Sequence, residues 1–249
     1  MKKIEQKDLF ELKNVGQPLV AGDAFFFTET KMNEKKNTYE TAIYKYTADG
    51  NVAYGDEGTV NSSLKVSPDG KWISFISNAG EEKTPQLKIQ SVHGGKAIAL
   101  TEEKKGVSSY VWAKDSQSIV FQTTKPEEEE KKEEFPQPIV VEKTTYRFDG
   151  GTFLPNDEVT QIKKVDVATK ECTTLFESKE SIGLRDVLHH GTTLVVDRDL
   201  SNVRWTLDSA EACYVDVTTG DIHPILEAGT DESYRYVLDS RDGAVLQYS

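Results

Sequence analysis

One short segment recurs along this chain, and the recurrence limits the folds that are open to it. Residues 64–77 contain an apolar strand, a Ser-Pro-Asp-Gly turn and a second apolar strand. Pro68 has the fixed φ that the second position of a turn favours, and Gly70 accepts the positive φ needed where the chain reverses. β-Branched and aromatic residues flank the turn, as they do in half-buried strands. The segment therefore predicts a β-hairpin.

Copies of this hairpin lie elsewhere in the chain. Residues 113–121 repeat residues 67–75 in register, about 46 positions further on. Residues 237–248 repeat the strand, the Ser-x-Asp-Gly turn and the next strand. Weaker copies lie at 21–27 and 190–196. Recurrence at a fixed spacing indicates a repeat architecture.

A second type of hairpin alternates with the first. Its copies lie at 44–50, 86–100, 161–175 and 214–226. Two hairpins per period of about 46 residues give four strands per repeat, which is the size of one blade of a β-propeller. A solenoid or a β-sandwich is the competing interpretation, but a sandwich would not require turns and strands that recur in register.

The sequence therefore predicts an all-β propeller of four-stranded antiparallel blades. Four full blades and one partial blade are expected near 17–58, 59–105, 106–180, 181–228 and 229–249. The partial blade ends in an apolar strand and would leave strand edges unpaired. We therefore expect 1–249 to be a fragment of a propeller that closes with further blades, about seven in all. The unpaired edges also favour association with a second copy.

Composition restricts the partners and the compartment. A net charge of −12 argues against a nucleic-acid partner, because such binding depends on Lys and Arg neutralising phosphates. No apolar run of about 18 residues and no signal-peptide pattern are visible, so we expect a cytoplasmic protein that does not enter membranes. Cys172 and Cys213 lack CxxC spacing, which favours two packed thiols over a zinc site. We expect neither a metal nor a cofactor.

The third blade contains a charged insertion at 125–138, in which Glu, Lys and Pro dominate. A segment of this composition is not suited to a sheet, and we expect a solvated loop. The functional alternative is a lid, or an arm that docks a partner.

The segment that follows the insertion carries a family resemblance. Residues 145–154 read Thr-Tyr-Arg-Phe-Asp-Gly-Gly-Thr-Phe-Leu, and a strand ending Val165-Asp166-Val167 comes next. Together with the Ser-Pro-Asp-Gly-Lys-Trp hairpin, this pattern resembles the propeller of prolyl oligopeptidase-family serine peptidases, particularly the acylaminoacyl-peptidase-like branch. TolB-type propellers share the hairpin. The resemblance covers essentially the whole chain.

The resemblance implies that this chain is one domain of a longer polypeptide and that catalysis belongs to another domain. In that family an α/β-hydrolase domain with a Ser-Asp-His triad follows the propeller, which caps the active site and admits short peptides. This sequence contains no Gly-x-Ser-x-Gly nucleophile elbow, so we expect no catalytic residue in it. The expected partner is the missing C-terminal hydrolase domain of the same polypeptide. The expected substrates of the parent are short or N-acylated peptides, and the chain alone should be inactive.

Three residues after the insertion are the candidate substrate-binding residues, namely Tyr146, Arg147 and Asp149. An Arg guanidinium can bind a peptide carboxylate through two parallel hydrogen bonds, and this segment ends an excursion from the sheet. The structural alternative is a contact between Arg147 and Asp149 that pins the insertion to its blade.

Other candidate motifs have plainer interpretations. His93-Gly94-Gly95 has the composition of an oxyanion loop, but it aligns with the hairpin turns at 168–170 and 218–220. His189 and His190 would point to opposite faces of a strand and lack a further ligand. The glutamates at 127–130 lack the spacing of a calcium loop.

Two other classes of protein stay open at this stage. A stand-alone TolB-like propeller would bind a protein partner and would never have had a hydrolase domain. A sugar-processing or lyase propeller would need a cluster of His, Arg or metal ligands at its centre, which the sequence does not indicate.

Overall fold

The computed structural model describes residues 3, 5–80, 82–126, 138, 140, 158–188, 191–199, 210–226, 235–239 and 244–248. The chain divides into two compact units. The first comprises residues 1–108, 114–117 and 165–171, and the second comprises 109–113, 118–164 and 172–249. One 3-10 helix, η1 (Gln6–Glu11), precedes the strands in the described part of the chain.

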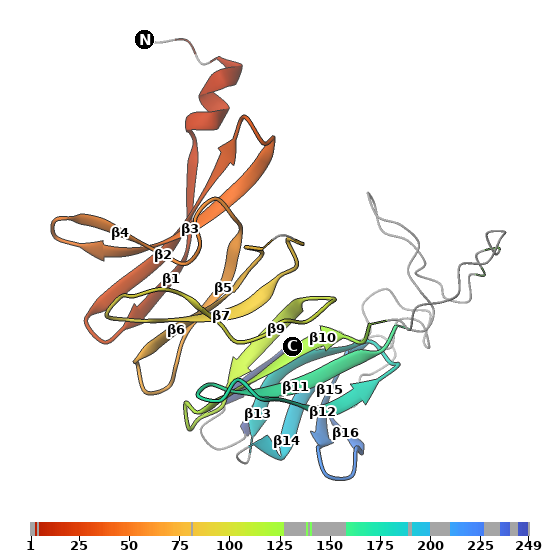
Figure 1. Cartoon of the computed structure of the whole chain (residues 1–249). Coiled ribbons are helices and arrows are strands. Elements are labelled where there is room, and N and C mark those ends of the chain that lie inside the picture. The colour runs from red at the N-terminus through yellow and green to blue at the C-terminus, as the bar shows by residue number, and fades with distance from the viewer. Residues whose placement is uncertain are drawn as a thin grey trace. The chain divides into compact units, whose positions relative to one another are not determined.

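The strands form consecutive sheets in chain order (Figure 1). The first sheet contains β1 (Lys13–Ala21), β2 (Ala24–Asn33), β3 (Thr38–Thr47) and β4 (Gly50–Tyr54). The second contains β5 (Asn61–Val66), β6 (Trp72–Ser77), β7 (Gln86–Ser91) and β8 (Ile98–Ala99). The third contains β9 (Val107–Trp112), β10 (Ser118–Thr124), β11 (Thr160–Asp166) and β12 (Cys172–Ser178).

Two further sheets follow. The fourth contains β13 (Ile182–Leu188), β14 (Thr193–Asp199), β15 (Ala210–Asp216) and β16 (Ile222–Leu226). The last pairs β17 (Arg235–Asp239) with β18 (Ala244–Tyr248), antiparallel. Neighbouring strands of the first, second and fourth sheets also pair antiparallel. The predicted all-β class with four-stranded antiparallel sheets is confirmed.

The Ser-Pro-Asp-Gly segment forms the predicted tight turn between β5 and β6. The N–H of Gly70 donates to the Ser67 carbonyl at 2.8 Å, and Gly70 has φ +73°. The Ser67 hydroxyl donates to Asp69 Oδ1 at 2.7 Å and accepts from the Trp72 N–H at 3.0 Å. The serine and the aspartate of the motif therefore satisfy polar groups that the reversal would leave without partners.

The core of the first unit lies between its two sheets. Phe26 and Ile43 from the first sheet and Phe75 from the second are each 0% exposed and belong to one apolar cluster. The Phe26 and Tyr54 rings meet edge to face, with centroids 5.0 Å apart. Burial of one such aromatic or aliphatic side chain stabilises the fold by about 1.5–3 kcal/mol. On β6 the consecutive residues Ile73–Ser77 are all buried, so both faces of this strand are covered.

The second unit has an apolar core of its own. Val120 and Ile162 of the third sheet pack with residues of the fourth, among them Leu194 and Val215, and all four are 0% exposed. Cys213, also 0% exposed, belongs to the same cluster. The apolar residues of β10 and β14 lie in continuous buried runs, Ile119–Phe121 and Leu194–Val196, so both faces of these two strands are covered.

Candidate functional site

The predicted substrate-binding residues Tyr146, Arg147 and Asp149 lie outside the described residues. The same holds for most of the charged insertion and for His189 and His190. Their predicted roles stay predictions.

His93-Gly94-Gly95 forms a turn, as its alignment with other hairpins predicts. The Gly94 N–H donates to the Ser91 carbonyl at 2.9 Å, and the His93 N–H donates to Ser91 Oγ at 3.2 Å. Both bonds close the connection after β7. Among the described residues, no group of three or more His, Cys, Asp and Glu side chains is arranged to hold a metal ion.

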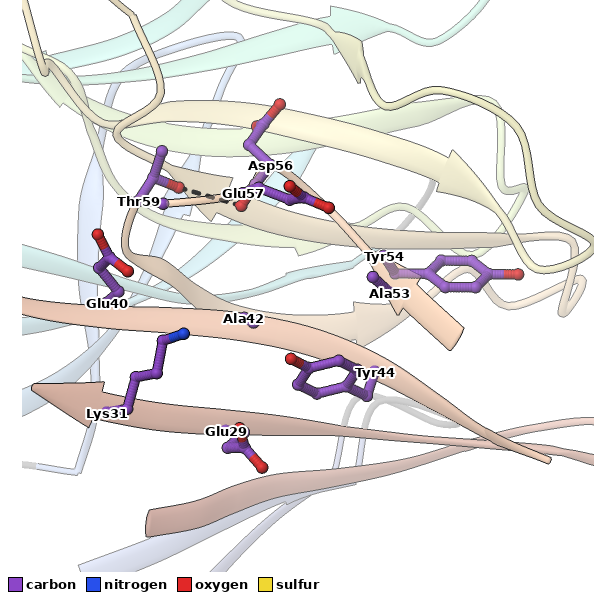
Figure 2. A pocket seen from close by; sticks show the side chains of 11 residues that line it. Glu29, Lys31, Glu40, Ala42, Tyr44, Ala53, Tyr54, Asp56, Glu57 and Thr59 are labelled. Carbon is purple, nitrogen blue, oxygen red and sulfur yellow. Dashed lines mark hydrogen bonds between the residues drawn. The ribbon is translucent and has the colours of Figure 1, made fainter. Parts of the chain in front are cut away.

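The first sheet carries a pocket of about 370 Å³, and this pocket is the candidate site. Its lining combines acidic, basic, aromatic and small residues: Glu29, Lys31, Glu40, Ala42, Tyr44, Ala53, Tyr54, Asp56, Glu57, Gly58 and Thr59. Figure 2 shows Glu29 and Lys31 on β2, Ala42 and Tyr44 on β3, and the loop 56–59 on the other side of β3.

Strand register brings the strand residues of this pocket together. Lys31 lies opposite Glu40, and Glu29 lies opposite Ala42, in the pairing of β2 with β3. Tyr44 lies opposite Ala53 in the pairing of β3 with β4. Because side chains alternate between faces along a strand, these residues share one face of the sheet. The opposite face carries Phe26 and Ile43, which are in the core.

The loop after β4 forms the other wall. Beyond Tyr54 the chain leaves the sheet, and the Thr41 N–H then donates to the Thr59 carbonyl at 2.8 Å. The amide of Asn61, a residue that is 0% exposed, donates to the Thr41 and Asp56 carbonyls at 2.8 and 2.9 Å. Gly58, with φ +68°, completes the loop. The wall is therefore held by backbone and buried amide contacts.

Three carboxylates of the pocket are paired with lysines. Glu29 lies 3.0 Å from Lys13 Nζ. Asp56 lies 2.8 Å from Lys88 Nζ, and its carboxylate also accepts from the Ser77 hydroxyl at 2.9 Å. The Lys88 and Asp56 side chains are only 14% and 26% exposed, so this ion pair is partly shielded from solvent.

Glu40 is the third paired carboxylate. Its Oε1 accepts from Lys36 Nζ at 2.9 Å and from the Asn33 side-chain amide at 2.8 Å. The hydrogen bond from Lys36 holds the pKa of Glu40 below its ordinary value, and that from Asn33 acts in the same direction. Glu40 therefore stays ionised near neutral pH and fixes the hairpin between β2 and β3.

Sequence reasoning missed this pocket. Alternation in Glu29-Thr30-Lys31 predicts that both charged side chains share a solvent-facing side of a strand. Their position opposite Ala42 and Glu40 depends on the strand register, and the wall depends on the path of residues 55–59. Neither is encoded in a local motif.

No protein-family model matches the chain. One curated relative is the uncharacterized peptidase YuxL of Bacillus subtilis (strain 168), which is 28% identical over 212 residues. That match covers 81% of this chain, and the chain spans only 32% of the relative.

Solved structures show the fold. An acylaminoacyl peptidase from Pyrococcus horikoshii matches with a TM-score of 0.70 and 21% identity, over 95% of this chain and 35% of that one. The β-propeller domain of the Trilobed protease from Pyrococcus furiosus matches with a TM-score of 0.56 and 18% identity, over 90% and 60%. A putative TolB from Agrobacterium tumefaciens matches with a TM-score of 0.55 and 13% identity, over 94% and 80%.

These likenesses define the class of protein. The chain has the fold of a β-propeller, as its repeats predict. Its resemblance to the propellers of prolyl oligopeptidase-family peptidases and of TolB is confirmed. In the described part of the chain, no helix has the length and apolar character that crossing a bilayer requires.

Proposed function

We propose that this chain is the substrate-gating propeller of a cytoplasmic serine peptidase that acts on short or N-acylated peptides, and that it is not catalytic by itself. The supporting observation is the likeness to the peptidase YuxL over 81% of this chain, while most of that relative lies outside the match. A propeller beside a hydrolase domain would select substrates by size, because a folded protein cannot pass where a short peptide can. We further propose that each predicted blade range is one repeat of that propeller.

The proposal is tested with two polypeptides. The first is this 249-residue chain, and the second is the whole polypeptide encoded by its reading frame. The chain alone should hydrolyse neither an acyl-peptide nor a prolyl chromogenic substrate. The longer polypeptide should hydrolyse short peptides and leave a long substrate such as casein intact. Turnover by the isolated chain that a point substitution within it abolishes would overturn the proposal, as would a longer polypeptide with no peptidase activity.

Within this proposal, Tyr146, Arg147 and Asp149 contact the substrate. A guanidinium binds a carboxylate through two hydrogen bonds, which an ammonium cannot reproduce. Arg147→Lys in the longer polypeptide should therefore raise KM about tenfold and leave kcat unchanged. An unchanged KM with a lower unfolding temperature would indicate instead that Arg147 only pins the insertion.

The second candidate function is a stand-alone propeller that binds a protein partner. The likeness to the putative TolB from Agrobacterium tumefaciens supports it, because the match extends over 80% of that chain. The two proposals differ in the reading frame beyond Ser249. A Gly-x-Ser-x-Gly motif there would favour the peptidase, and a stop codon after blade closure would favour the binding module.

A further inference from the structure

The pocket of the first sheet contains two charged side chains, Lys31 and Glu57, that no hydrogen bond or salt bridge among the described residues holds. Its other carboxylates, Glu29, Glu40 and Asp56, are each held by a lysine. Among the described residues, the Lys31 ammonium and the Glu57 carboxylate form neither a hydrogen bond nor an ion pair, although both line the pocket. Lys31 interacts with the Glu40 carboxylate only through the longer-range attraction of the two charges. An acidic metal site is therefore not what this lining offers, because its paired carboxylates are already neutralised.

The walls between these two charges suit a small organic molecule. Ala42 and Ala53 have short side chains, so the sheet leaves space above them. Tyr44 adds an aromatic face, and its hydroxyl has no hydrogen-bond partner among the described residues. Figure 2 shows Lys31 rising from β2 and Glu57 from the loop after β4, with Ala42 and Tyr44 on β3 between them. One cation and one anion thus border a partly apolar floor.

We infer that this pocket binds a small zwitterion, with the ligand carboxylate on Lys31 and the ligand ammonium on Glu57. Free amino acids and short unblocked peptides are the molecules of this class. A volume of about 370 Å³ lies at the lower end of the range for small-molecule pockets, which suits one to three residues. The inference goes beyond the proposed function, because it concerns this chain alone and requires no hydrolase domain.

The expected affinity is low. Both charged groups are exposed, and an exposed charge pair contributes only about 0–1 kcal/mol. Two such contacts and one aromatic wall place the dissociation constant on the order of 1 mM. Selectivity is more informative than affinity here, because blocking either end of the ligand leaves one protein charge without a partner.

The experiment titrates the 249-residue chain with alanine, Ala-Ala and Ala-Ala-Ala at low salt, followed by NMR chemical shifts. The ligand that binds most tightly of these three shows how many residues the pocket accommodates. The same titration uses N-acetyl-Ala-Ala, which lacks the ammonium, and Ala-Ala-amide, which lacks the carboxylate. Each blocked dipeptide should bind about two- to fivefold more weakly than Ala-Ala.

Two substitutions assign the two ends of the ligand. Lys31→Gln should weaken Ala-Ala about two- to fivefold and leave the affinity for Ala-Ala-amide unchanged. Glu57→Gln should weaken Ala-Ala to the same extent and abolish the preference over N-acetyl-Ala-Ala. Ala42→Leu fills the pocket without a change of charge and should weaken every ligand.

Matched controls come from the turn between β2 and β3. Glu34→Gln and Lys35→Gln remove the same charges from exposed residues outside the pocket lining, and they should leave Ala-Ala binding unchanged. Thermal unfolding of each variant checks that it is folded. The inference is overturned if no unblocked ligand saturates, if blocked and unblocked dipeptides bind equally, or if the control variants weaken binding as much as Lys31→Gln. None of these outcomes bears on peptidase activity, so the proposed function is judged separately.

Discussion

The side-chain oxygen of Gln122 accepts a hydrogen bond from the backbone N–H of Leu184 at 2.8 Å and so joins the third sheet to the fourth. The amide nitrogen of the same glutamine donates to the Ile182 carbonyl at 3.1 Å. The first unit has a counterpart, in which Gln17 Oε1 accepts from the Leu64 N–H at 2.9 Å. Both receiving strands, β5 and β13, shift register beside the bonded leucine. A glutamine of one sheet therefore satisfies a backbone group beside an irregularity in the next.

Gln122→Ala should destabilise the chain by about 1–3 kcal/mol, because it leaves the backbone N–H of a buried residue without its partner. Leu184 is only 6% exposed, so water does not readily replace the lost acceptor. Urea unfolding of the variant measures the change. The matched control is Gln117→Ala in an exposed turn, which should change stability by less than about 0.5 kcal/mol. Equal effects of the two substitutions would contradict the bridging role of Gln122.

The two cysteines should differ sharply in reactivity. Burial raises the pKa of the Cys213 thiol to about 12, and the nearby Glu211 carboxylate acts in the same direction. Because the thiolate is the reactive form, Cys213 should not react with a disulfide reagent at pH 8 while the chain is folded. Cys172 is exposed and should react. The Cys172→Ser variant should therefore show no thiol that reacts with the reagent while it is folded. After denaturation the same variant should show one reactive thiol, that of Cys213. A rapid reaction of the folded variant would refute this.

The repeat pattern predicts the class of fold because each hairpin carries its own turn chemistry. Ser67, Asp69 and Gly70 form the bonds expected of a tight turn, and the apolar residues around them occupy the core. Such features are local, since alternation and turn residues act within a few positions of one another.

The candidate pocket and the bridging glutamines lie beyond this local information. Gln122 and Leu184 are 62 positions apart, and their bond requires both the packing of two sheets and a register shift in β13. Lys31 and Glu57 line one pocket only because a loop leaves the sheet after Tyr54. No motif records a contact between residues so far apart, so single-sequence reasoning did not find them.

Two matching turns carry different residues at the position with positive φ, and this difference should affect stability. Asp166 and Asp216 each accept backbone hydrogen bonds from the residues two and three positions later. The position after these is Lys170 with φ +62° in one turn and Gly220 with φ +77° in the other. A residue with a Cβ is strained there by about 1–2 kcal/mol.

Gly220→Ala should therefore destabilise the chain by about 1 kcal/mol, and Lys170→Gly should stabilise it by a smaller amount because glycine also makes the unfolded chain more flexible. Chemical denaturation of both variants measures whether each substitution raises or lowers the free energy of unfolding. If both substitutions change the free energy of unfolding in the same direction, the left-handed conformation does not determine the stability of these turns.

Asp69 makes the stability of the first unit depend on pH. The hydrogen bond from the Ser67 hydroxyl holds the pKa of Asp69 below its ordinary value of 3.8, and the backbone N–H of Lys71 contributes in the same direction. A carboxyl whose pKa is lowered by folding stabilises the folded state above its unfolded pKa, and this contribution is lost as the pH falls through the folded value.

Asp69→Asn keeps a side-chain oxygen as acceptor but removes the charge. Wild type should therefore be the more stable of the two at pH 7, and the difference should close as the pH falls below about 4. Thermal unfolding across that range measures it. A gap between wild type and Asp69→Asn that widens as the pH falls would contradict the assignment.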